Sequence, residues 1–453
     1  MPTTRQFFKP DFTTPLPKLR KALSAPGLLG LVREAFAQID DSRTRCQIPL
    51  VDALMSGLAV FGLKYPSLLQ FDLAYQDESL IRGNLKRLYG VEHAPCDTQL
   101  RTRLDPVDPE SLRGAFRAVH RQVQRYKGLE PYAYWNNHYL LSVDGTGQFA
   151  STAISCPECC QRQRKSGQTE YYHQLVGAVI VHPELNTVLP MMPEAITRQD
   201  GASKNDCELN AAKRLLRRVR ADQPKLKFIV VEDSLAANAP HIELLGVLNM
   251  RYLLGVKPRA HRHLFEQVDA AQDVQQLEVS VAPNHTRGYR WIHGLSLNAS
   301  NPECKVNYLE HWEIIDGQRR VWSWVTDLPL STETVEAFAR AGRARWKVEN
   351  ETFNTLKNQG YHLEHNYGHG QQHLATVFAQ LMMLAFLIDQ VQESCCRLFQ
   401  AARNRFHARI VLWERLRNLF LTFRIADWNT LWAAIIRGQR TGDWLTPDTP
   451  DTS

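Results

Sequence analysis

The sequence has no uninterrupted apolar run long enough to cross a membrane. Its most apolar stretch, residues 375–388 (ATVFAQLMMLAFLI), is shorter than the roughly 20 residues of a spanning helix, and Thr376 and Gln380 interrupt it. The first twenty residues are polar and contain several prolines, which is not the pattern of a secretory signal. We therefore expect a cytoplasmic protein with no membrane partner, in which 375–388 is a core helix.

Cysteine is scarce and unevenly placed. Of the nine cysteines in 453 residues, six are scattered and three lie together in 156–160 (CPECC). Cytoplasmic cysteines are normally reduced, and Cys-x2-Cys spacing is typical of one half of a zinc site. Ordinary reduced thiols remain the alternative, because no second Cys-x2-Cys follows. The candidate ligands for a structural Zn²⁺ are Cys156, Cys159 or Cys160, together with His173 or Cys207.

Basic residues are only slightly in excess, since the net charge is +7, but they gather in places. One cluster is 213–220 (KRLLRRVR), and a more dispersed one runs through 397–420. A solvated helix face explains either cluster taken singly. Several such clusters in one chain favour a polyanionic partner such as nucleic acid.

The periodicity of apolar residues changes along the chain and predicts four regions. Residues 21–127 show helical periodicity, for example over 50–63 and 109–126, so we expect a helical N-terminal region over 1–127 that binds DNA. Strand-like runs and helices then alternate from 139 to 256 in the order β-β-β-α-β-α-β. That order is typical of a ribonuclease-H-like mixed sheet, so we expect an α/β catalytic core over 128–260 and 332–392. Residues 393–453 read as a helical C-terminal region with a disordered tail.

Residues 261–331 read as an antiparallel β insertion that is separate from this core. The segments within 275–328 alternate apolar and polar residues, as half-buried strands do. Asp316-Gly317 predicts a two-residue hairpin turn between the last two strands. The predicted fold is therefore a mixed-sheet core with an inserted β subdomain, flanked by helical N- and C-terminal regions.

Two aspartates follow strand-like runs. Asp144 ends 139–144 and precedes a Gly-Thr-Gly turn, and Asp233 ends 227–233. In the predicted sheet order these strands are neighbours, so both carboxylates meet at one edge, where a divalent cation such as Mg²⁺ relieves their repulsion. The alternative is that each aspartate forms a turn or caps the next helix. Glu232 points to the opposite face by strand alternation.

A third carboxylate comes from a predicted helix. Projected at about 100° per residue, 345–357 places Glu349 on the apolar face with Trp346, Phe353 and Leu356, and Glu351 on the solvent face. A glutamate on an apolar face needs a partner. Arg345, one turn earlier, provides one explanation as a salt bridge. A metal site explains Asp144, Asp233 and Glu349 together, and a pair of Mg²⁺ or Mn²⁺ ions suits phosphoryl transfer.

Three segments resemble, in this order, bacterial insertion-sequence transposases of the DDE type: SVDGTG (142–147), VVEDSLAAN (230–238) and RARWKVENETFNTLK (343–357). The β insertion resembles the subgroup that excises its element through hairpin ends, whose motif is Tyr-x2-Arg-x3-Glu-x6-Lys. Arg345 and Glu349 fit this motif. Ala341 or Gly342 stands where the tyrosine belongs, and Lys357 comes one residue late, with Leu356 at the motif position.

The resemblance implies an enzyme that cuts and joins insertion-sequence ends, with Asp144, Asp233 and Glu349 as catalytic metal ligands. Arg345 and Lys357 then hold terminal phosphates. One of Trp322 and Trp324 then stacks on a base that is flipped out of the DNA. The alternative is that both tryptophans only pack in the core of the sheet. The implied partner is double-stranded DNA, as element terminal inverted repeats and as target, bound by a homodimer in the nucleoid.

Two other functions are compatible with these motifs. One is a non-catalytic, domesticated DNA-binding relative, against which the three acids argue. The other is a metal-dependent nuclease without strand transfer, against which the β insertion argues. The histidines at 362, 365, 369 and 373 have spacings that suit metal ligands on a helix. Gly368 and Gly370 interrupt them, however, and favour a loop that lies near DNA or in solvent.

Overall fold

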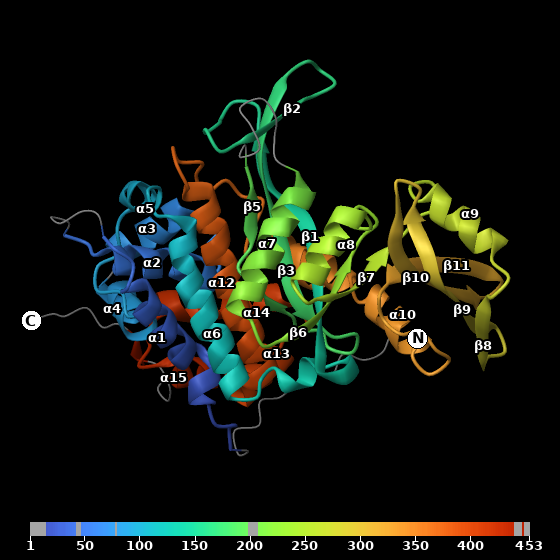
Figure 1. Cartoon of the computed structure of the whole chain (residues 1–453). Helices are drawn as coiled ribbons and strands as arrows, with labels where there is room; N and C mark the ends of the chain where they lie inside the picture. The colour runs from blue at the N-terminus through green and yellow to red at the C-terminus, as the bar shows by residue number, and fades with distance from the viewer. Residues whose placement is uncertain (1–14, 42–46, 78, 198–206, 439–445, 448–453) are drawn as a thin grey trace, which may run out of the picture. The chain divides into compact units, whose positions relative to one another are not determined.

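The computed structural model describes residues 15–41, 47–77, 79–197, 207–438 and 446–447 (Figure 1). The chain divides into two compact units. The helical unit combines residues 1–130, 147–174 and 354–453, so the N-terminal and C-terminal helical regions belong to one body. The sheet unit combines residues 131–146 and 175–353, which include the β insertion. Strands β1 and β3 pass from one unit into the other.

The helical unit is built around α12, the 22-residue helix Leu374–Cys395. By length and composition this helix is apolar enough to cross a membrane, but almost all of it is buried inside the protein. A helix that is apolar on all sides is stable in water only when other elements surround it. The prediction of a core helix at 375–388 is confirmed. The other helices of this unit are α1 (Ala25–Phe36), α2 (Leu50–Gly62), α3 (Leu68–Asp77), α4 (Ser79–Tyr89), α5 (Asp97–Leu104), α6 (Arg113–Arg125), α11 (Asn354–Asn358), α13 (Arg397–Asn404), α14 (Arg409–Thr422) and α15 (Trp428–Arg437).

The fold is mixed α/β, with an 11-stranded mixed sheet and flanking helices (Figure 1). The strand order is β2-β3-β1-β6-β7-β11-β10-β9-β8, and β4 and β5 pair with β3. The strands are β1 (His138–Ser151), β2 (Cys160–Gln163), β3 (Thr169–Val181), β4 (Leu189–Pro190), β5 (Glu194–Ile196), β6 (Lys227–Glu232), β7 (Arg251–Gly255), β8 (Gln275–Ala282), β9 (His285–Asn298), β10 (Asn301–Ile315) and β11 (Gln318–Thr326). The helices of the sheet unit are α7 (Glu208–Asp222), α8 (Ala239–Val247), α9 (Arg262–Ala270) and α10 (Val335–Arg343).

The sequence indicated that the β insertion is separate from the core, but in the structure its strands belong to the same sheet as the core strands. Strands β8 to β11 form an antiparallel ribbon, and β11 pairs with β7 through Trp324–Thr326 against Leu253–Gly255. The insertion therefore extends the core sheet through three residue pairs. The predicted turn at Asp316-Gly317 is confirmed, since Ile315 pairs with Gln318 and both turn residues have positive φ, +50° and +77°.

A buried ion pair stabilises the helical unit. Lys64 is 1% exposed, and its Nζ lies 2.7 Å from Oδ2 of Asp389, which also accepts a hydrogen bond from the hydroxyl of Tyr361 at 2.6 Å. The ammonium also lies 4.2 Å from the ring centres of Tyr361 and Trp413. Burial lowers the pKa of Lys64, and Asp389 opposes that shift. The pair is satisfied only while both partners are present.

We therefore expect Lys64→Met to lower the free energy of unfolding by about 3 kcal/mol, because it leaves the carboxylate of Asp389 buried without its cation. Lys86, whose pair with Glu92 is exposed, is the matched control. Lys86→Met should cost less than about 1 kcal/mol. Urea denaturation of the full chain measures both values. Equal effects of the two substitutions would show that the buried pair contributes no more than a surface pair.

Candidate functional site

The register of β1 against β6 brings Asp144 and Asp233 together. The two strands are parallel, and their last recorded pair is Ser142 with Val231. Continued by two residues, this register places Asp144 beside Asp233, which directly follows β6. Strand β1 itself runs on to Ser151, so the prediction that Asp144 ends its strand is wrong. It is β6 that ends at this point, at Glu232, so Asp144 lies beside the end of its neighbouring strand.

Asp144 is partly buried and electrostatically coupled to its surroundings. Arg345 donates from Nη1 to its Oδ2 at 2.7 Å, and the N–H of Gly145 donates to its Oδ1 at 2.9 Å. Burial raises the pKa of Asp144 and the charge of Asp233 adds to that rise, while Arg345 and the N–H of Gly145 oppose it. The charge of Asp233 therefore acts on Asp144, as expected for two like charges at the same end of neighbouring strands.

Glu208 is a third carboxylate of this site, which the sequence did not reveal. It lies in the first turn of α7 and accepts a hydrogen bond from the N–H of Gly145 at 3.1 Å. Burial raises the pKa of Glu208, and the charges of Asp144 and Asp233 raise it further. A Cβ at position 145 would lie 2.6 Å from Cδ of Glu208, so the glycine makes this approach possible. An acid in a first helical turn is common and by itself signals nothing.

Glu349 does not lie on an apolar face, contrary to the prediction. It is exposed, and Trp346, expected beside it in the core, is 54% exposed. The projection failed because it assumed one continuous α-helix. Helix α10 ends at Arg343, and Val348–Phe353 forms a π-helix, whose turns contain more residues than α-helical turns.

Arg345 and Lys357, the two predicted phosphate ligands, each pair with a carboxylate of the protein. Arg345 pairs with Asp144, and its carbonyl accepts a hydrogen bond from the hydroxyl of Ser142 at 2.9 Å. Lys357 belongs to the helical unit, where its Nζ lies 2.9 Å from Oε1 of Glu364. Each cation is thus paired with a carboxylate of its own unit.

Trp322 and Trp324 differ in their surroundings. Trp324 is 5% exposed and packs against Gly342, where a Cβ would lie 2.4 Å from its ring. Trp322 is half-buried, its ring stacks on His311 at 5.5 Å, and the guanidinium of Arg343 lies 4.3 Å from its centre. A cavity of about 460 Å³ lies beside both rings, and its lining includes Asp233, Trp322, Trp324, Arg345 and Trp346.

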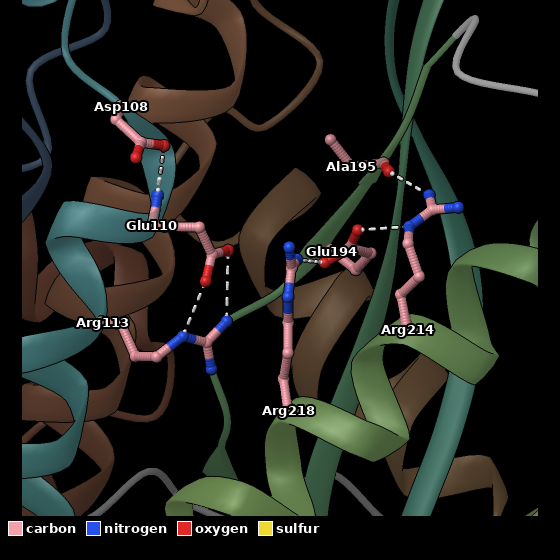
Figure 2. A network of polar contacts seen from close by, with 7 residues as sticks. All are labelled: Asp108, Glu110, Arg113, Glu194, Ala195, Arg214 and Arg218. Carbon is pink, nitrogen blue, oxygen red and sulfur yellow. Dashed lines mark hydrogen bonds and ion pairs between the residues drawn. The ribbon is translucent and has the colours of Figure 1, made fainter.

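Two of the five cations in the basic cluster at 213–220 pair with one carboxylate within the sheet unit. Figure 2 shows Arg214 and Arg218 of α7 converging on the carboxylate of Glu194, with Arg214 also donating to the carbonyl of Ala195. The C-terminal cluster behaves similarly in the helical unit. There Arg409 pairs with Glu393 at 3.1 Å, and Arg405 donates to backbone carbonyls. The charge runs in the sequence therefore overstate the free positive surface.

In the helical unit, the turn that precedes α6 is held by a hydrogen bond and an ion pair between neighbouring residues. Figure 2 shows the carboxylate of Asp108 accepting the N–H of Glu110 at 3.0 Å, while Arg113 pairs with the side chain of Glu110 at 2.9 Å. These contacts fix the start of the helix. They also remove Arg113 from the count of free cations.

A compact group of sulfur and nitrogen ligands forms in the helical unit. One ligand atom from each of Cys156, Cys159, His173 and His369 lies within 4.8 Å of the others. In the part of the chain that the structure describes, no other group of three or more Cys, His, Asp or Glu side chains brings its ligand atoms so close together. The group could bind a metal such as zinc.

Cys160 and Cys207, the other predicted ligands, lie outside this group. Cys160 is buried at the start of β2. Cys207 is exposed at the N-terminus of α7. The sequence grouped His369 with its neighbouring histidines instead of with the cysteines. The loop expected there is confirmed, since Gly368 and Gly370 have φ values of +144° and +71°, but the expected solvent exposure is wrong for His369, which is 5% exposed.

We expect Glu208→Gln to stabilise the protein at neutral pH. Since burial and the two aspartates raise the pKa of Glu208, the folded state favours its protonated form, and the charged form destabilises the fold. The gain in unfolding free energy should be about 0.5–1 kcal/mol at about pH 7, because solvent screens a half-buried group. The difference from wild type should shrink as the pH falls through the raised pKa towards 4.5.

Urea denaturation across this pH range measures the effect. The exposed Glu349, changed to Gln, is the control and should alter the stability by less than about 0.5 kcal/mol. A Glu208→Gln protein that is less stable than wild type at neutral pH would contradict the repulsion described above.

The sequence was compared with models of known protein families and with curated proteins. No family model matches it, and no curated protein matches it either. The transposase resemblance therefore remains a prediction, carried by the three motifs and by the arrangement of the residues within them.

Proposed function

We propose that the protein is a DNA transposase of the DDE type, which cuts and joins insertion-sequence ends on a ribonuclease-H-like core. The observation that carries the proposal is the placement of Asp144 and Asp233 at the same end of the neighbouring strands β1 and β6, with Asp144 and Glu208 accepting the same N–H of Gly145. Partly buried like charges weaken a fold and are kept at sites that use them. The parallel order β1-β6-β7, with β3 on the other side of β1, supports this core.

The carboxylates suit a magnesium ion chemically. Mg²⁺ prefers oxygen ligands, and Asp144, Asp233 and Glu208 supply them from two neighbouring strand ends and a helix start. The sequence motif offers Glu349 as another third ligand. When bound, Mg²⁺ supplies Lewis-acid activation of the attacking water or hydroxyl and stabilises the leaving 3′ oxygen.

Arg345 connects the acidic site to DNA in this proposal. Its guanidinium pairs with Asp144, and the same planar group binds a phosphate through two parallel hydrogen bonds. Exchange of the carboxylate for a DNA phosphate would leave Asp144 free to act as a ligand. Arg345 also lines the cavity that contains Asp233 and Trp322, so a phosphate held there lies beside the acids.

Trp322 suits an unpaired base at the same cavity. Its ring is half-buried, with His311 stacked on it and Arg343 lying over its centre, so a base would stack there in place of the guanidinium of Arg343. Trp324 is buried and serves the packing of the sheet against α10. An aromatic platform beside an acidic site fits an enzyme that works on distorted DNA ends.

We expect Asp144→Asn and Asp233→Asn each to reduce DNA cleavage by more than about 100-fold, because even residues that only orient metal ligands contribute 10- to 100-fold. The substrate is linear DNA that carries the flanks of the coding sequence, incubated with the full chain and Mg²⁺. Binding of the same DNA, measured in parallel, should change little.

Glu208→Gln and Glu349→Gln identify the third ligand, and Glu351→Gln is the matched control. If only Glu208→Gln loses cleavage, the third ligand is Glu208, as the geometry favours. If only Glu349→Gln loses cleavage, the third ligand is Glu349, as the sequence motif favours. Cleavage without joining would indicate a nuclease, and binding without cleavage by the wild type would indicate a non-catalytic relative. Full activity of both aspartate variants would refute the proposed site.

We expect Trp322→Ala to weaken binding of DNA with an unpaired terminal base by about 5- to 150-fold, since stacking on an aromatic ring contributes about 1–3 kcal/mol per base. Fully paired DNA of the same sequence is the control, and its affinity should change by less than about twofold. Fluorescence anisotropy measures both. An equal loss for the two DNAs would show that Trp322 acts by general packing.

A further inference from the structure

We propose that Cys156, Cys159, His173 and His369 bind one structural Zn²⁺, which fastens the β2–β3 hairpin to the loop before α12. This inference is independent of the proposed function, since it concerns residues of the helical unit and requires no DNA chemistry. Its ligand set also differs from the one that sequence spacing suggested, because the fourth ligand lies 210 residues from Cys159 along the chain.

The four ligand atoms are close to tetrahedral spacing. The recorded separations are 3.4 Å between the two sulfurs, 3.4 and 3.2 Å from these sulfurs to Nε2 of His173, and 3.3 Å from Cys159 to Nδ1 of His369. Zn–S bonds of about 2.3 Å and Zn–N bonds of about 2.0–2.1 Å give edges of about 3.4–3.8 Å. The four recorded edges therefore match a tetrahedral zinc site to within a few tenths of an ångström, and all four ligand atoms lie within 4.8 Å of one another.

The chemistry of the set favours zinc over the alternatives. Two thiolates balance the charge of one Zn²⁺, and their two protons pass to solvent when the metal binds. Cys159, His173 and His369 are buried, and a neutral centre suits that position. A disulfide between the two cysteines would require their sulfurs to approach from 3.4 Å to about 2.05 Å. Two imidazoles directed at the sulfurs are not needed for a disulfide.

The backbone and a neighbouring ring support the ligands. The N–H of Cys156 donates to the sulfur of Cys159 at 3.3 Å, and the N–H of Cys159 donates to the carbonyl of Cys156 at 3.1 Å. The first of these bonds stabilises a thiolate. Phe149 covers the imidazoles, with ring centres 5.2 Å from His173 and 4.7 Å from His369.

The loop that supplies His369 is held by hydrogen bonds, whereas the loop before Cys156 buries little apolar surface. The loop that contains His369 is held by Asp105, whose carboxylate accepts the N–H groups of Gln371, Gln372 and Leu374 at 2.9–3.2 Å. The loop before Cys156 is exposed from residue 152 to 155, and its Ile154 is 52% exposed. A metal supplies the fixed point that this loop does not obtain from hydrophobic packing.

Elemental analysis of the full chain, purified without chelators, tests the site. We expect about one zinc per chain in wild type, and less than about 0.2 in Cys156→Ser and in His369→Ala. Cys160→Ser and His365→Ala are matched controls from the same two segments and should retain the metal. Replacement of zinc by Co²⁺ should give the visible absorption of a tetrahedral site with thiolate ligands.

Hydrogen exchange tests the role of the metal and also covers variants that fold poorly. Removing zinc from wild type should increase exchange in 152–168 at least tenfold, while the hairpin around Asp316-Gly317 should not change. Less than about 0.2 zinc in wild type, a Cys156–Cys159 disulfide seen by mass spectrometry, or loss of zinc from the controls as readily as from the ligand variants would overturn the proposal. None of these results depends on DNA cleavage, so the proposed function is tested separately.

Discussion

The parallel pairing of β1 with β6 is the constraint on which the acidic site depends. Five consecutive pairs, from His138–Lys227 to Ser142–Val231, fix the register. A shift by one residue would turn the side chain of Asp144 to the other face of the sheet. The buried residues of both strands hold the register, since Leu140, Leu141 and Ile229 are fully buried. The core thus provides the rigid support for a site that is itself unfavourable for stability.

The three carboxylates are electrostatically unfavourable for the folded protein. Asp144, Asp233 and Glu208 repel one another, and Arg345 relieves only part of that repulsion. Elsewhere in the protein, charged groups are matched more completely, as in Lys64 with Asp389 or Glu194 with Arg214 and Arg218. The contrast supports a role for the carboxylates outside folding, because a purely structural cluster would pair its charges.

Local patterns in the sequence predicted local structure well and distant contacts poorly. Continuous apolar runs located β1 and β6, and turn chemistry located the Asp316-Gly317 turn, because each depends on neighbouring residues. Glu208 and His369 were missed, because their partners lie 63 and 210 residues away and no short spacing marks them. The π-helix at Val348–Phe353 changed the face of Glu349, and regular 3.6-residue periodicity cannot represent it. The association of β11 with β7 depends on only three residue pairs, so the insertion looked separate in the sequence.

The central claim is that Asp144 and Asp233 together bind a divalent metal when DNA is present. Electron paramagnetic resonance of Mn²⁺ tests it directly, by titrating the full chain with Mn²⁺ in the presence of DNA that carries the element's ends. The account predicts bound Mn²⁺ in wild type and a loss of at least tenfold in affinity when both aspartates are changed to asparagine. Unchanged Mn²⁺ binding in that double variant would contradict it.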